Sequence, residues 1–255
     1  MNLKTFLAML ARDAHVARRN FLTILIQTLL QPMFFVFIFG RVMTTSGLMS
    51  EQYKVLLLPG IIAISMFMSG IMAVAMPLVS EFQFSREIED RLLAPMEIEW
   101  LAVEKVLAGM IQALIAGLVV LPTAWLVMGG VALSTNHLLF FGIIALLVSG
   151  LAAAIGLTLG CSVGQIQIGL MFSMVLAPMI FFGCTYYPWR TLDAFPVLQW
   201  AVLINPVVYA SEGLRGALVP QFPHLSGYLV LIALALFDAA FLFLGLRQFR
   251  RKAVS

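Results

Sequence analysis

Charged residues are scarce in this chain of 255 amino acids: 15 Lys and Arg and 12 Asp and Glu together make up only 11% of it. Hydrophobic residues make up 62%, whereas a soluble domain usually carries roughly a quarter charged and about half apolar residues. This composition excludes a disordered chain and argues against a soluble enzyme. The long apolar runs predict an all-α polytopic membrane protein, since a transmembrane β-barrel would alternate polar and apolar residues.

Cysteine, histidine and lysine are also scarce, and their placement limits the chemistry of the chain. The two cysteines and three histidines form no group with metal-ligand spacing. None of the four lysines follows a glycine, as the lysine of a nucleotide-binding loop must. We therefore expect no catalytic site, metal or cofactor in this chain. The net charge of +3 is weak evidence for nucleic-acid binding, because basic residues near chain ends also set membrane orientation.

Charged residues separate the apolar runs, and the runs predict six membrane-spanning helices. A helix needs about 20 apolar residues to cross a hydrocarbon core roughly 30 Å thick. The 84 uncharged residues between Lys105 and Arg190 suit three helices, with polar turns after Gly129 and Ser162. In chain order, the predicted spans are residues 21–40, 55–79, 103–128, 138–162, 168–187 and 227–246.

The distribution of Lys and Arg predicts the orientation of these spans. Eleven of the 15 lie in the N-terminal segment, the loop 80–105 or the C-terminal tail, which an even number of spans places on one side. Cytoplasmic segments carry an excess of basic residues. We therefore expect both termini to be cytoplasmic.

Two segments on the predicted cytoplasmic side are amphipathic. Residues 1–20 are predicted to form an interfacial helix lying on the inner leaflet. In the loop 80–95, Phe84, Ile88 and Leu92 recur every four residues and give one apolar helical face, which Pro95 ends. From the residues alone, this face could rest on lipid or on its own bundle, or could enter a groove on a partner.

The predicted outer segment 188–226 holds five of the eleven prolines, yet it is apolar and carries few charges. We expect short re-entrant helices that dip into the outer leaflet, where non-helical backbone must be shielded by protein or line a wet cavity. Glu212 and Arg215 in this segment stand three residues apart. They predict a surface ion pair of little energy.

Polar and small residues within the spans have two interpretations each. Asp238 lies near the middle of the last span, where an acid costs about 2.5–3.5 kcal/mol unless it is paired, protonated or hydrated. Gln27 and Gln31 share one face of the first span. Gln27 and Gln31 either line a transport path or bond to neighbouring helices. Asp238 either relays protons or contacts substrate, or it bonds to a neighbouring helix. The stripe of small residues at positions 152, 156, 160 and 164 favours packing within one subunit over a dimer seam.

Two local motifs, in this topological order, resemble those of the ABC-2 type exporter permeases. The first is EDRLLAP at residues 89–95, after the second span. The second runs from Phe182 through Tyr187-Pro188 to NPVVY at residues 205–209, with Glu212 and Arg215 beyond it. The resemblance covers nearly the whole chain, although Asp90-Arg91 replaces the Gly-Thr that the family often has. Because no large extracellular domain is inserted, the compact exporters are the better match.

The resemblance implies an exporter of a lipid-linked glycan, a lipid or a hydrophobic drug, located in the plasma (bacterial inner) membrane. It implies a homo- or heterodimer of permeases with two copies of a cytosolic ATP-binding subunit, which holds the ATP and Mg. The residues that it implies for coupling to this ATPase are Phe84, Ile88, Glu89, Arg91, Leu92, Leu93 and Pro95. Those that it implies for an outer gate are Tyr187, Pro188, Asn205, Pro206, Tyr209, Glu212 and Arg215. It also favours Gln27 and Gln31 as residues of the translocation path, for which Asp238 is a further candidate.

Two functions of other classes stay open at this point. A secondary transporter driven by an ion gradient would use several buried ionisable groups and internal repeats, and residues 1–127 and 128–255 show no convincing repeat. An integral membrane enzyme would use a cluster of intramembrane His, Asp or Glu, whereas Asp238 stands alone in its span. The sequence favours the exporter over both.

Overall fold

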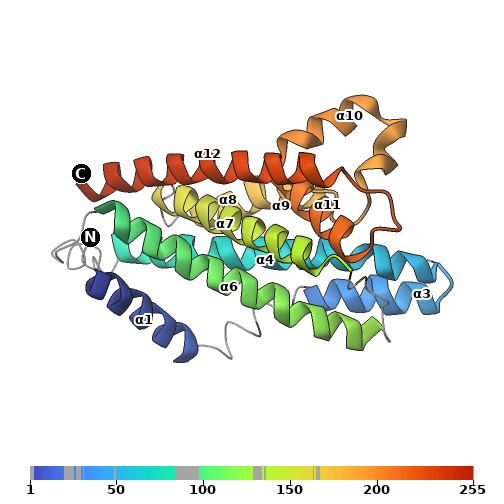
Figure 1. Ribbon diagram of the computed structural model, residues 1–255, viewed down its shortest axis with the longest axis horizontal. Coiled ribbons are helices and arrows are strands. Elements are labelled where there is room, and N and C mark those ends of the chain that lie inside the picture. The colour runs from blue at the N-terminus through green and yellow to red at the C-terminus, as the bar shows by residue number, and fades with distance from the viewer. Residues whose placement is uncertain are drawn as a thin grey trace.

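The computed structural model describes residues 3–19, 26, 30, 32–48, 50–83, 98–128, 134, 136–162, 164 and 167–254. Within these ranges the protein is helical and has no strand (Figure 1), which confirms the predicted all-α class. Among the described residues, four helices are long and apolar enough to cross a membrane. They are α4 (Glu51–Gln83), α6 (Ile98–Met128), α7 (Leu138–Ser162) and α12 (Gly227–Val254).

These four helices correspond to the second, third, fourth and sixth predicted spans. Within the first predicted span, the structure describes residues 26, 30 and 32–40, and an apolar helical stretch runs over Pro32–Thr45. This stretch ends in the π-helix η1 (Ile38–Val42) and the short α3 (Met43–Thr45). Where the fifth span is predicted, the structure has three consecutive helical elements, α8 (Ile168–Met171), the π-helix η3 (Phe172–Leu176) and α9 (Ala177–Phe181). The last of them ends six residues before the predicted end at position 187. The count of six spans stays a prediction.

Helix α4 is the centre of the bundle and contacts α6, α7 and α11 (Pro206–Leu218) (Figure 1). Its contact with α7 depends on small side chains. A Cβ atom on Gly156 would stand 2.8 Å from the Ile71 carbonyl oxygen, and one on Gly160 would stand 3.0 Å from the Ala75 Cα. The small-residue stripe of α7 therefore packs within the subunit, as the sequence predicts.

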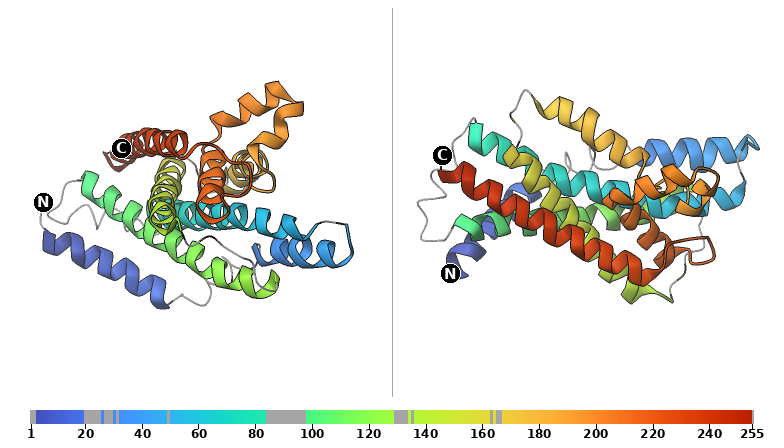
Figure 2. Two further views of the ribbon diagram at one scale, coloured as in Figure 1. Left: turned by 45° about the vertical axis from the view of Figure 1, so that its right-hand side comes forward. Right: turned by 90° about the horizontal axis from the view of Figure 1, so that it is seen from above.

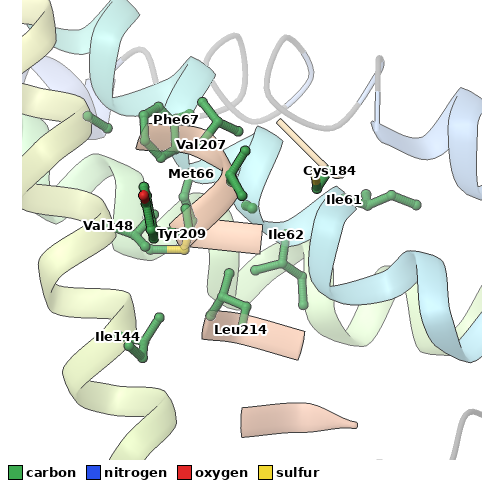
Figure 3. Close-up of a cluster of buried hydrophobic side chains, with 14 of the residues drawn as sticks. Ile61, Ile62, Met66, Phe67, Ile144, Val148, Cys184, Val207, Tyr209 and Leu214 are labelled. Atoms are coloured by element: carbon green, nitrogen blue, oxygen red, sulfur yellow. The ribbon is translucent and has the colours of Figure 1, made fainter. Parts of the chain in front are cut away.

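A central apolar cluster joins α4, α7 and α11 (Figure 3). Side chains of α4 and α7 face α11 across this cluster, and Cys184 of the turn that follows α9 lies at one side of it. The buried members drawn in Figure 3 include Ile61, Ile62, Met66, Phe67, Ile144, Val148, Cys184, Val207, Tyr209 and Leu214. This packing fixes α11 against the bundle, although α11 is too short to cross a membrane.

The helix α1 (Leu3–Arg19) lies beside the first turns of α6, at the same end of the bundle as the C-terminus (Figures 1 and 2). The ring of Phe6 meets Trp100 edge-on, with 6.2 Å between centroids. Figure 2 also shows α12 running alongside α7. The two chain ends thus share one end of the bundle, and the short outer helices lie at the other.

Candidate functional site

The outer-gate motif converges on a turn, residues 182–187, which follows α9. We call this segment the outer turn. Its backbone is unusual, because Cys184 has a φ of 52°, in the left-handed region that residues other than glycine seldom adopt. A conformation of this kind persists only where surrounding structure holds it. Three neighbouring helices supply that support.

Asn205 and Pro206 start α11 and tie it to α9. The Asn205 Oδ1 accepts a hydrogen bond from the N–H of Val207 at 3.0 Å, which caps the helix. Pro206 occupies the first helical position, where its missing N–H costs nothing. The Asn205 Nδ2 donates to the Met179 carbonyl at 2.6 Å. The Asn205 side chain therefore provides a hydrogen-bond partner for one backbone N–H at the start of α11 and for one backbone carbonyl in α9.

Side chains of α11 and α4 bind three carbonyls of the outer turn. Ser211 Oγ donates to the carbonyl of Gly183 at 2.5 Å, and Arg215 Nη2 donates to that of Cys184 at 3.0 Å. From α4, the Tyr53 hydroxyl donates to the carbonyl of Tyr186 at 3.1 Å. The outer turn is thus held through its backbone, because each of these side chains donates a hydrogen bond to one of its carbonyl oxygens.

Glu212 connects three outer segments through its carboxylate. Oε1 accepts from the N–H of Trp189 at 3.0 Å and from Arg215 Nη1. Oε2 accepts from the N–H of Leu225 at 2.9 Å. Trp189 begins η4 (Trp189–Ala194), and Leu225 lies just before α12. The carboxylate therefore fixes the segments on both sides of α11.

The expectation of a surface ion pair between Glu212 and Arg215 is wrong. Glu212 is 1% exposed and Arg215 is 0% exposed. A buried pair is favoured when its remaining donors and acceptors also find partners. Here the Cys184 carbonyl and the backbone N–H groups of Trp189 and Leu225 provide most of them, whereas the buried Arg215 Nε makes no hydrogen bond among the described residues. Burial lowers the pKa of the Arg215 guanidinium, and the nearby Glu212 carboxylate opposes that shift.

The remaining gate residues make local contacts around the outer turn. The Tyr187 hydroxyl donates to the Phe181 carbonyl at 3.2 Å, and Pro188 is buried directly before η4. The Tyr209 hydroxyl donates to the Leu203 carbonyl at 2.9 Å. All seven predicted gate residues therefore lie in the outer turn, in its junction with η4, or on α11 and its cap.

Beyond the outer turn, η4, α10 (Pro196–Ala201) and η5 (Val202–Ile204) form a short projecting arm (Figure 1). The Trp189 Nε1 donates to the Gln199 carbonyl at 2.8 Å and its ring meets Trp200 edge-on. Val197, Trp200 and Ile204 are exposed on this arm. An exposed apolar surface suits contact with lipid, as expected for a re-entrant segment.

Sequence reasoning missed Tyr53, Gly60 and Ser211. Ser211 could have been found, because it precedes Arg215 by four residues and so shares a helical face with it. Tyr53 could not, because its partner Tyr186 lies 133 residues away. Gly60 stands where the Thr185 carbonyl leaves no room for a side chain.

The structure places one of the three predicted path residues. Asp238 lies at the contact of α12 with α7, and its Oδ1 would be 3.0 Å from a Cβ atom on Gly150. Gln27 and Gln31 lie outside the described residues, as do all the predicted coupling residues, Phe84, Ile88, Glu89, Arg91, Leu92, Leu93 and Pro95. In the part of the chain that the structure describes, no group of three or more His, Cys, Asp or Glu could hold a metal ion.

Comparison with known proteins adds one finding. A family model described as ABC-2 type transporter matches residues 4–219. The matched range includes the outer turn, α11 and three of the four spanning helices. No curated protein matches the sequence.

Proposed function

Because this chain belongs to the ABC-2 type transporter family, we propose that it is the membrane-spanning permease subunit of an ATP-driven exporter. The family match over residues 4–219 is the observation that carries this proposal. The chain has no lysine in a nucleotide-binding loop, so the energy comes from a cytosolic ATP-binding subunit that holds ATP and Mg. This chain itself is a non-catalytic subunit.

The complex that we propose contains two permeases, as a homo- or heterodimer, and two ATP-binding subunits. Each permease crosses the plasma (bacterial inner) membrane six times, with the Pro32–Thr45 stretch and the α8–α9 stretch completing the first and fifth spans. Both termini are cytoplasmic. The shared end of the bundle at which the two chain ends lie is consistent with an even number of crossings.

The proposed cargo is a lipid-linked glycan, a lipid or a hydrophobic drug, and it moves outward. The proposed path passes Gln27, Gln31 and Asp238. Polar groups inside a span are costly unless they face protein or water, which supports a path lined by these side chains rather than contact with lipid.

The proposed outer gate is α11 together with the outer turn. Its support is the bonding around Glu212 and Arg215, which joins α11, η4, the outer turn and the segment before α12. A unit bonded in this way moves as one body, because bending within it would strand buried polar groups. Gating then occurs by displacement of the whole unit against the bundle.

The proposed contact with the ATPase is the amphipathic segment 80–95. Its apolar stripe of Phe84, Ile88 and Leu92 enters a groove on the ATPase, and the neighbouring Glu89, Arg91, Leu93 and Pro95 complete the contact. Closure of the ATPases on ATP pushes this segment and opens a path between the two permeases.

Co-purification tests this proposal. The tagged wild-type chain is expected to bring down a P-loop ATPase, and export by the complex is expected to require ATP. Replacing Ile88 and Leu92 by Asp should abolish both, because two charges would enter an apolar contact. Leu48→Asp is the matched control, since Leu48 is 76% exposed in the loop before α4. Transport by the purified chain alone, driven by an ion gradient, would overturn the proposal.

A further inference from the structure

The side-chain ammonium group of Lys105 joins three helices at the end of the bundle opposite the outer turn. The Lys105 Nζ on α6 lies 2.8 Å from Glu81 Oε1 on α4 and 2.8 Å from Asp13 Oδ2 on α1. The side chains of Lys105, Glu81 and Asp13 are 4%, 8% and 18% exposed. We call these three residues the inner clamp.

Burial distinguishes the inner clamp from an ordinary surface pair. At the other end of α4, Lys54 also pairs with a glutamate, but its partner Glu51 is 78% exposed. A solvated pair of that kind contributes little to structure. Within the inner clamp, two largely buried carboxylates from different helices bond to one ammonium group, and these bonds hold the three helices in one arrangement.

Apolar packing reinforces the same junction. A second buried cluster, separate from the central one, gathers Leu78 of α4, Leu101 and Val106 of α6, and Phe249 of α12. Met9 of α1 packs against it. The ends of α4, α6 and α12 therefore share a core with α1, and the inner clamp adds directional bonds to that core.

The inner clamp flanks the segment that connects α4 and α6. Helix α4 ends at Gln83 and α6 begins at Ile98. Glu81 lies two residues before the first of these points, and Lys105 lies two helical turns after the second. The Glu81–Lys105 bond thus joins the two helices on either side of the segment that the proposed function assigns to the ATPase.

We propose that Lys105 is a positioning residue of the exporter, which makes α1, α4 and α6 move as one body when the ATPase displaces the segment between α4 and α6. This inference rests on the proposed function for the source of the movement. The joining of the three helices, however, can be measured without nucleotide. Without the inner clamp, α1, α4 and α6 would move independently. A displacement of the segment between α4 and α6 would then not be transmitted to the outer turn.

Pulsed electron spin resonance on the complex with its ATPase, in lipid vesicles, tests this proposal. One pair of spin labels replaces the exposed Ala11 of α1 and Leu118 of α6, and the other replaces the exposed Leu139 and Val197 at the outer end. In the wild type we expect a single narrow inner distance with and without the ATP analogue AMP-PNP. We expect the analogue to shift the outer distance.

Lys105→Met should broaden the inner distance and reduce the population that shifts at the outer end about tenfold, within the range typical of coupling between sites. Lys105→Arg should restore both, because a guanidinium can bond to two carboxylates. Lys54→Met, the same change in a pair whose carboxylate is exposed, should behave as the wild type. Should Lys105→Met fail to fold, Asp13→Asn weakens only the bond between α1 and Lys105 and should still broaden the inner distance.

The outcomes separate the two proposals. A narrow inner distance and a wild-type outer shift in Lys105→Met or Asp13→Asn would overturn the role of Lys105 and leave the exporter proposal standing. Absence of any outer shift in the wild-type complex would instead count against the exporter proposal, while the nucleotide-free inner distance would still report on the clamp.

Discussion

The backbone of Gly60 in α4 meets the carbonyl oxygen of Thr185 in the outer turn, with no space between them for a Cβ atom. Gly60 follows Pro59, which leaves the α4 backbone without an N–H at that position. The side chain of Thr185 is buried and donates from Oγ1 to the Ile180 carbonyl at 3.1 Å. The outer turn therefore rests directly on the backbone of the central helix.

This contact predicts the effect of Gly60→Ala. The added methyl would overlap a carbonyl oxygen rather than a flexible side chain, so the outer turn must move. We expect a loss of about 1–3 kcal/mol in the free energy of unfolding, as for other overpacked sites, measured by titration with SDS in mixed micelles. Gly142→Ala is the matched control, because no atom lies within 4 Å of its Cβ position in α7. It should stabilise the protein by about 0.5–1 kcal/mol, and equal effects of the two changes would contradict the contact.

The bonding around Glu212 predicts a large cost for Glu212→Gln. The Gln amide leaves the buried Arg215 guanidinium without a counter-charge. It also has only one acceptor oxygen, so it cannot accept hydrogen bonds from the N–H groups of both Trp189 and Leu225 through separate oxygens. We expect a loss of about 3–5 kcal/mol in the free energy of unfolding, typical of breaking a buried ion pair. Glu51→Gln removes the same charge from an exposed pair and should cost about 1 kcal/mol or less. A similar small cost at both positions would mean that the Glu212 site is hydrated.

Limited proteolysis provides a second test of the role of Glu212. Released from its two loop amides, the outer segment should become a better protease substrate in the Glu212→Gln variant, since cleavage follows local opening. Mass spectrometry of the fragments locates the cuts. Cuts confined to the ends of α4 and α6, with residues 188–226 intact, would contradict the role of Glu212 in holding that segment.

The placement of Asp238 gives a prediction for export. If its carboxylate lines the proposed path, Asp238→Asn should lower export on the order of tenfold, as befits an ionisable intramembrane group, while the similar shape of Asn preserves the contact with Gly150. Complementation of a deletion strain measures the effect. Asp193→Asn is the control, because Asp193 is exposed in η4 and its bond from Gln199 requires only an acceptor. Full export by Asp238→Asn would leave Asp238 with a packing role alone.

Local patterns were sufficient to predict the four described helices that are long and apolar enough to cross a membrane. Apolar length alone locates α4, α6, α7 and α12, because each must satisfy its backbone within one hydrophobic run. The same reasoning gave 55–79 for a helix that in fact runs from Glu51 to Gln83. The extra turns are polar or charged, and they have partners elsewhere in the chain, Tyr186 for Tyr53 and Lys105 for Glu81, which a hydropathy pattern does not contain.

The gate residues show where sequence reasoning ends. The resemblance identified Glu212 and Arg215, and the i,i+3 spacing predicted their pairing, but that spacing is identical for an exposed and a buried pair. Burial follows from partners that lie 13 residues away at Leu225 and 31 residues away at Cys184. Such distances are set by the tertiary fold, so the sequence alone pointed to the weaker surface pair.

Asn205 allows the two tasks of one side chain to be separated. Asn205→Ala loses the helix cap, which usually costs about 1 kcal/mol, and also loses the bond to the Met179 carbonyl, worth about 0.5–1.5 kcal/mol. Asn205→Asp keeps an acceptor for the N–H of Val207. At an ordinary cap, Asp and Asn are nearly equivalent, but here the second carboxylate oxygen would face the Met179 carbonyl at the position of a donor. We therefore expect Asn205→Asp to be at least as destabilising as Asn205→Ala in SDS titrations. Wild-type stability of Asn205→Asp would show that the cap alone matters and that α9 and α11 are not joined through this side chain.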